Sequence, residues 1–312
     1  MPDSHPSDRR ALLAYLLVCI VWGSTYTAIH IAVEHLPPFL MAGVRFLAAS
    51  VLLGGWVWWR GLPWPNGIGG VLHVAFCGVL LFLVGNGGVV WSLQFVPSGV
   101  ASVYVVMVGI WAAVLDALVP GGTGRITLRV TIGLVMAFIG SPLLVGATPA
   151  ELMGADWRGP IALLIASFGW ALGTVLMKRR PSPADPFANA TVQMIGGGLA
   201  MLIAGLWSGE AGHVVITTRG LWAFFYLVTI GSLVGFGAYA YALHHMSPTA
   251  LGTYAYVNPV VAVLLGRLLL GEPITKRTVI AMALMIGGAI VVQFGDRLAR
   301  LAPAGTDEPV QT

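Results

Sequence analysis

Long apolar stretches, separated by short polar breaks, occupy nearly the whole chain. A helix that crosses a bilayer needs about 20 mostly apolar residues. The stretches show no alternation of apolar and polar positions, and they are too long for the strands of a membrane barrel. A helix also satisfies every backbone polar group within one segment, which lipid demands. The pattern therefore predicts an all-α membrane protein with ten transmembrane helices, over Ala11–Ile31, Phe39–Trp59, Ile68–Trp91, Ser98–Val119, Leu128–Val145, Gly159–Met177, Phe187–Trp207, Leu221–Leu243, Thr249–Leu270 and Val279–Phe294.

The two halves of the chain repeat each other at a nearly constant spacing. Trp170 follows Trp22 by 148 residues, and the Ile-Thr-x-Arg turn at 126–129 returns at 274–277 with the same offset. Each half holds five apolar stretches, and because five is odd, the second half must enter the membrane in the opposite orientation. Many secondary transporters are built from such inverted repeats and bind their substrate where the repeats meet. We therefore expect two inverted five-helix repeats.

The repeats are expected at residues 11–146 and 159–295, joined by a polar linker. Residues 299–312 are polar and rich in proline and acidic residues, which predicts a disordered cytoplasmic tail. The first apolar stretch is about as long as a membrane span and has a repeat partner in the sixth stretch. We therefore expect it to be a transmembrane helix rather than a cleaved signal peptide.

The loops differ in positive charge between the two faces of the predicted topology. Ten basic residues fall in loops on the side of the N-terminus and four on the other side. Cytoplasmic loops of membrane proteins carry the excess of Lys and Arg, so both termini are expected in the cytoplasm. The ten are Arg9, Arg10, Arg60, Arg125, Arg129, Lys178, Arg179, Arg180, Arg297 and Arg300, and the four are Arg158, Arg219, Lys276 and Arg277.

Composition narrows the partners of the protein. The chain is 57% hydrophobic and only 9% charged, so no stretch remains that would build a soluble domain. The basic residues are scattered over short loops, which argues against a nucleic-acid surface. Cys19 and Cys77 lie within apolar stretches without any spacing typical of a metal site, so no metal and no cofactor are expected. The expected partners are the lipid bilayer and a small-molecule substrate, and the oligomeric state stays open.

Several short motifs resemble those of a known family. The run from Tyr256 to Gly266 contains Asn258-Pro259 and leads into Leu-Gly-Glu-Pro-Ile-Thr at 270–275. Trp22-Gly23-Ser24 in the first stretch and Arg45-Phe46 in the second are similar to the start of the repeat in the same family. Together these residues resemble EamA-type carriers of the drug/metabolite transporter superfamily. The resemblance implies an inner-membrane carrier of small organic solutes, often an exporter of amino acids or related metabolites. The first repeat departs from the pattern, since Met107 and Val108 stand where the second repeat has Asn258 and Pro259.

Aromatic and amide residues deep in the apolar stretches are the candidate substrate-binding residues. Residues four apart on a helix share a face, so Trp22 and Tyr26 lie on one stripe and Tyr254 and Asn258 on another. Pro259 removes a backbone donor and frees the carbonyl of residue 255, which makes it the candidate hinge. Packing is the alternative role for the aromatic residues, and interhelical hydrogen bonding for the amides. The full set is Trp22, Tyr26, Asn86, Tyr104, Trp170, Tyr254 and Asn258, a neutral site suited to a zwitterionic or uncharged solute with an apolar part.

Charged side chains inside a bilayer are costly, and they are therefore either paired or functional. Arg45 lies near the outer face, and Glu34 at the end of the first stretch is its natural partner. This pair is either a structural ion pair or a gate. Asp116, near the cytoplasmic end of the fourth stretch, is expected to pair with Arg125 or Arg129 across a short turn.

The inverted repeat predicts a secondary transporter that works by alternating access, and the family resemblance implies that it exports amino acids or related compounds across the inner membrane. The alternatives are an importer or facilitator of another neutral solute, or a membrane subunit that does not transport. No nucleophile, metal-ligand set or acid pair typical of an enzyme is visible, so the chain is not expected to be an enzyme. A charged ring typical of a channel filter is also missing. Proton coupling and the identity of the substrate stay open.

Overall fold

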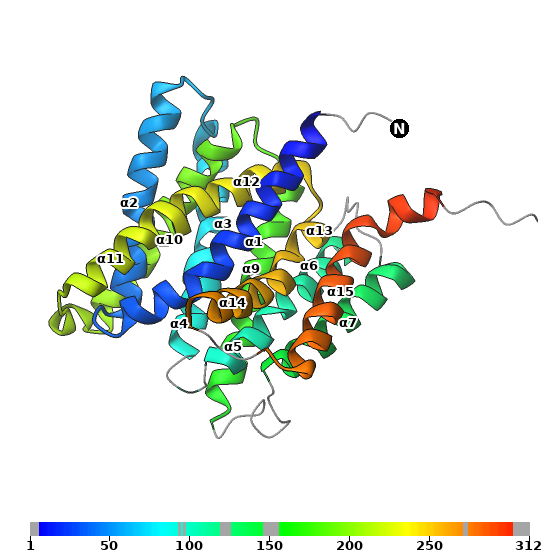
Figure 1. Cartoon of the computed structure of the whole chain (residues 1–312). Coiled ribbons are helices and arrows are strands. Elements are labelled where there is room, and N and C mark those ends of the chain that lie inside the picture. The colour runs from blue at the N-terminus through cyan, green and yellow to red at the C-terminus, as the bar shows by residue number, and fades with distance from the viewer. Residues whose placement is uncertain are drawn as a thin grey trace, which may run out of the picture.

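The computed structural model describes residues 6–92, 95, 98–118, 126–145, 156–270 and 274–301, and every regular element in these ranges is a helix (Figure 1). The all-helical prediction is thus confirmed for the described part. The elements of the first half are α1 (Pro6–Val33), α2 (Pro38–Trp59), α3 (Gly67–Val79), η1 (Leu80–Gly87), α4 (Gly88–Ser92), α5 (Ser98–Val105), α6 (Met107–Leu118) and α7 (Leu128–Val145). Those of the second half are α9 (Arg158–Arg179), α10 (Pro186–Trp207), η2 (Glu210–His213), α11 (Thr218–Tyr226), η3 (Leu227–Val234), α12 (Gly235–His245), α13 (Pro248–Gly252), α14 (Tyr254–Leu270) and α15 (Lys276–Leu301).

Membrane-spanning length is reached by six of the described helices or continuous helical runs. They are Pro38–Trp59, Gly67–Ser92, Arg158–Arg179, Pro186–Trp207, Thr218–His245 and Pro248–Leu265. Two shorter apolar helices, Val103–Leu118 and Leu128–Leu144, add to them. The chain is therefore a multi-pass membrane protein, and the count of ten spans stays a prediction. α15 ends at Leu301, and residues 302–312, most of the predicted tail, lie outside the described residues.

The second helix of each half begins in the same way. Proline occupies the first helical position of both α2 and α10, where its fixed φ suits the helix and its missing N–H costs nothing. Asp185 precedes α10 with extended backbone, and its side chain accepts a hydrogen bond of 2.8 Å from the Phe187 N–H. Such a cap satisfies one of the free N–H groups at the helix start.

Helices at equivalent positions of the two halves make equivalent contacts. α2 packs along α10, and α7 packs along α15. In the centre, α9 packs against η1 and α6, just as α1 packs against α12 and α14. Figure 1 shows α2 and α10 on one flank, α7 and α15 on the other, and α1, α9 and α14 between them. The two halves therefore enclose a central region to which both contribute the same elements.

Small residues let these helices approach closely. A Cβ on Gly78 of α3 would lie 2.1 Å from the backbone oxygen of Gln193 on α10, and one on Gly197 would lie 2.5 Å from the backbone oxygen of Gly78. No side chain fits between the two backbones at this crossing. In lipid, where the hydrophobic effect does not drive helices together, such close packing is a main source of association.

The third span of each half is interrupted by a π-helical segment. η1 begins at Leu80 and η3 at Leu227, which are nearly equivalent positions of the two repeats. A π-helical turn is wider than an α-helical turn, and such segments frequently lie at functional sites. Both segments border the central region described next.

Candidate functional site

Two tryptophans at equivalent positions of the halves touch at the centre of the molecule. The rings of Trp22 on α1 and Trp170 on α9 lie edge to face with their centroids 5.5 Å apart. Tyr239 and Tyr254 extend the cluster, with ring centroids 5.2 and 5.0 Å from that of Trp22. Edge-to-face aromatic pairs of this kind contribute about 0.5–1.5 kcal/mol beyond the area they bury. The halves therefore meet at an aromatic cluster to which each supplies the same tryptophan.

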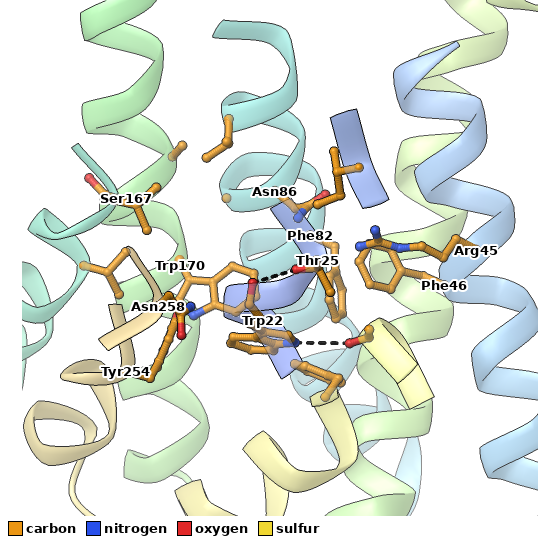
Figure 2. A pocket seen from close by; sticks show the side chains of 18 residues that line it. Trp22, Thr25, Arg45, Phe46, Phe82, Asn86, Ser167, Trp170, Tyr254 and Asn258 are labelled. Atoms are coloured by element: carbon orange, nitrogen blue, oxygen red, sulfur yellow. Dashed lines mark hydrogen bonds between the residues drawn. The ribbon is translucent and has the colours of Figure 1, made fainter. Parts of the chain in front are cut away.

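A cavity of about 140 Å³ borders this cluster, a volume close to the one needed for a single benzene ring. Figure 2 shows side chains that reach it from helices of both halves. The lining residues are Trp22, Thr25, Ile29, Arg45, Phe46, Phe82, Gly85, Asn86, Val89, Val105, Val108, Ala166, Ser167, Trp170, Gly231, Phe236, Tyr254 and Asn258. The wall is mostly apolar with a few polar groups, which is the usual composition of a small-molecule site.

Hydrogen bonds hold the cavity wall in place. Trp22 Nε1 donates to the carbonyl oxygen of Gly231 in η3 at 3.1 Å, and Thr25 Oγ1 donates to the carbonyl oxygen of Trp22 at 2.8 Å (Figure 2). With its amide nitrogen turned toward the backbone, Asn258 donates to the carbonyl oxygens of Tyr254 and Cys19, both at 3.1 Å. Asn258 therefore bridges α14 and α1. This is the interhelical hydrogen bonding expected as the alternative to substrate binding, and Asn258 also lines the cavity.

Arg45 lines the same cavity and brings a positive charge into it. The residue is 5% exposed, and its guanidinium carbon lies 4.3 Å from the centroid of the Phe46 ring. The expected ion pair with Glu34 is not formed among the described residues, and the Glu34 carboxylate lies 4.0 Å from His35 Nε2. A site that contains Arg45 is not neutral, so the neutral site expected from the sequence needs correction.

The structure brings five of the seven candidate residues to one cavity, namely Trp22, Asn86, Trp170, Tyr254 and Asn258. Tyr104 lies on α5 outside the lining set, whereas its neighbour Val105 belongs to it. The side chain of Tyr26 lies outside the described residues. Pro259 lies inside α14, one residue after Asn258.

Several lining residues were not among the sequence-based candidates, including Thr25, Phe82, Ser167 and Phe236. Thr25 lies three residues after Trp22, and Ser167 three before Trp170, so both share a helix face with a candidate tryptophan. This three-residue spacing from a candidate tryptophan is the sequence signal that would have identified Thr25 and Ser167. Phe82 belongs to the π-helical η1, where the α-helical period does not apply.

A buried ion pair connects the two halves away from the cavity. Arg179 on α9 donates from Nη2 to Asp116 Oδ1 on α6 at 2.7 Å and also to the Asp116 carbonyl oxygen. The side chains are 11% and 1% exposed. Lys178 donates to the carbonyl oxygens of residues 243 and 244 at the end of α12, both at 2.8 Å. The expected partner of Asp116 was Arg125 or Arg129. The observed partner lies in the other repeat, and Arg125 lies outside the described residues.

Within the described part of the chain, no group of three His, Cys, Asp or Glu side chains is placed to hold a metal ion. Cys19 and Cys77 are both buried free thiols.

The chain matches one family model and is similar to several known proteins. The model of the EamA-like transporter family matches residues 9–146 and 157–294. The chain is 37% identical to the uncharacterized inner membrane transporter YedA of Escherichia coli K12, over 93% of this chain and 92% of that protein. It is 26% identical to a probable amino-acid metabolite efflux pump of Salmonella typhimurium, over 92% of this chain and 96% of the pump. A crystal structure of a protein 19% identical in sequence has the same fold, with a TM-score of 0.75 over 92% of this chain and 98% of that one.

Proposed function

Because this chain belongs to the EamA-like transporter family, we propose that it carries small organic solutes across the inner membrane through the cavity beside Trp22 and Trp170. Family membership confirms the resemblance seen in the sequence and makes the protein an inner-membrane transporter rather than an enzyme. The observation that carries the proposal is the contact of the two repeat-equivalent tryptophans at the cavity wall. In carriers built from repeats, the substrate binds where the repeats meet.

We propose that the repeats, residues 11–146 and 159–295, are five-helix units of opposite orientation with both termini in the cytoplasm. The mirrored contacts of α1 and α9 support the equivalence of the units, and the ten-to-four bias of basic loop residues supports the orientation. In this topology Asp116 and Arg179 lie on the cytoplasmic side of the cavity. Their ion pair would close that side, and alternating access would require it to open.

The direction and solute class of the proposal are efflux of amino acids or related metabolites. The Salmonella relative, which is named as a probable efflux pump for such compounds, supports both. The cavity supports a small solute with an apolar part, since its volume suits one ring and aromatic side chains form much of its wall. Import of the same solutes is the alternative, and efflux from preloaded cells separates the two directions.

Replacing Trp170 with alanine tests the proposal. Cells that overproduce the protein should survive a toxic level of at least one solute in a panel of amino acids and related metabolites. Trp170→Ala removes an aromatic wall worth about 0.5–1.5 kcal/mol per ring contact, so efflux of that solute from preloaded cells should fall about threefold to tenfold. Trp207→Ala is the matched control, because Trp207 is 90% exposed at the end of α10. If Trp170→Ala exports the solute as fast as the wild type at equal membrane abundance, the Trp170 ring has a packing role and does not bind the solute.

A further inference from the structure

Arg45 is a buried cation that has no acidic partner among the described residues. Arg45 is 5% exposed, and its Nε atom is buried without a hydrogen-bond partner among the described residues. None of the cavity-lining residues that the structure describes carries a carboxylate. A charge held inside a membrane protein is costly unless it is paired, and side chains left in this state usually serve substrate or ion binding.

The position of Arg45 aims its charge at the cavity. The Phe46 ring, 4.3 Å from the guanidinium carbon, supports one face of the group. Figure 2 shows the side chain extending from α2 toward the space lined by Phe82 and Asn86, with Trp170 and Tyr254 on the opposite side of the view. The cavity thus has a cationic end beside Arg45 and an aromatic end beside the paired tryptophans.

We propose that Arg45 binds the carboxylate of the transported solute and that the carrier selects small organic monocarboxylates with an aromatic or apolar body. The inference deepens the proposed function and rests on it. The planar guanidinium donates two parallel hydrogen bonds to a carboxylate, and a partner of opposite charge removes the cost of the buried cation. The apolar body of the acid then lies against the rings of Trp22 and Trp170.

The charges of the cavity favour a monocarboxylate over other solutes. Among the described lining residues Arg45 is the one cation, so it balances a single negative charge and leaves a phosphate dianion half compensated. A solute that carries a positive charge and no carboxylate is repelled by Arg45, and no carboxylate among the described lining residues offsets this repulsion. Asn86 also lines the cavity, and its amide nitrogen can donate a hydrogen bond to a carboxylate.

Three ligands of nearly one size test the proposal on the purified full-length protein. They are 3-phenylpropionate, its uncharged amide 3-phenylpropanamide, and the cation phenethylamine. Binding is measured by the ligand-dependent rise of the unfolding temperature in detergent. The acid should stabilise the wild-type protein, and the amide and the amine should bind at least tenfold more weakly. In Arg45→Gln the acid should lose this advantage and bind no better than the amide. Arg60→Gln is the matched control, because Arg60 ends the same helix but is exposed and outside the cavity.

Stability separates a binding role from a structural one. Arg45→Met removes an unpaired buried charge and keeps the apolar stem, so without ligand its unfolding temperature should equal or exceed that of the wild type. The proposal is overturned if the acid does not stabilise the wild type, if acid and amide bind alike, or if Arg45→Gln still prefers the acid. Amide binding that Trp170→Ala abolishes and Arg45→Gln leaves unchanged would overturn the role of Arg45 while the cavity remained the binding site.

Discussion

Replacing Asp116 with alanine should lower the free energy of unfolding by about 3–5 kcal/mol, the loss expected when one partner of a buried ion pair is removed. The change leaves the Arg179 guanidinium, 11% exposed, without the carboxylate that now lies 2.7 Å from it. The pair joins α6 of the first half to α9 of the second, so its loss also frees the two halves to separate at this end. The measurement is thermal or denaturant unfolding of the purified protein in detergent.

A double variant distinguishes the buried charge from general damage. Asp116→Leu combined with Arg179→Met replaces both partners with apolar side chains, and such replacements are often neutral or stabilising. The double variant should therefore regain most of the stability that Asp116→Ala loses. If Asp116→Ala is as stable as the wild type, the two groups are effectively solvated and the pair does not hold α6 to α9.

Gly78→Ala should destabilise the protein by about 1–3 kcal/mol, the usual cost of forcing an extra methyl group into a packed interior. The new Cβ would lie 2.1 Å from the backbone oxygen of Gln193. A side chain could relieve such a clash by changing its rotamer, but a backbone atom cannot. α3 and α10 must therefore move apart, and this crossing belongs to the contact between the halves. The expected readouts are a lower unfolding temperature and less protein in the membrane.

Gly69→Ala is the matched control in the same helix, because a Cβ at Gly69 meets no atom within 4 Å. Alanine has the higher helix propensity, so this variant should be as stable as the wild type or slightly more stable. Equal stability of Gly78→Ala and Gly69→Ala would mean that α3 and α10 are not in close contact at Gly78.

The hydrophobic pattern predicts much of the fold because it is a local property of the chain. Bilayer thickness sets the length of each apolar stretch, and α2, α9 and α10 lie close to their predicted ranges. The repeat likewise follows from the sequence, since Trp22 and Trp170 stand at matching positions. Tyr254 and Asn258, four residues apart, line the same cavity as the spacing predicts, because both lie on an α-helix before Pro259.

Partners distant in sequence could not be predicted in the same way. Asp116 pairs with a residue 63 positions away in the other repeat, and nothing local marks that contact. That Arg45 has no acidic partner among the described residues likewise depends on the position of Glu34 in the turn between α1 and α2. Phe82 lies in the π-helical segment η1, where the spacing of residues on one face differs from that of an α-helix. The α-helical period therefore could not predict that Phe82 lines the cavity.

The central claim, that the cavity between the two halves is the solute pathway of an alternating-access carrier, is tested most directly by a cysteine at Asn86. The native Cys19 and Cys77 are 1% and 0% exposed and give little background. Asn86→Cys should react with a membrane-impermeant maleimide both in right-side-out and in inside-out vesicles, because the cavity opens to each side in turn. Arg60→Cys, expected in the cytoplasm, should react in inside-out vesicles alone and so reports the orientation. Reaction of Asn86→Cys from one side only, or from neither, would contradict the account.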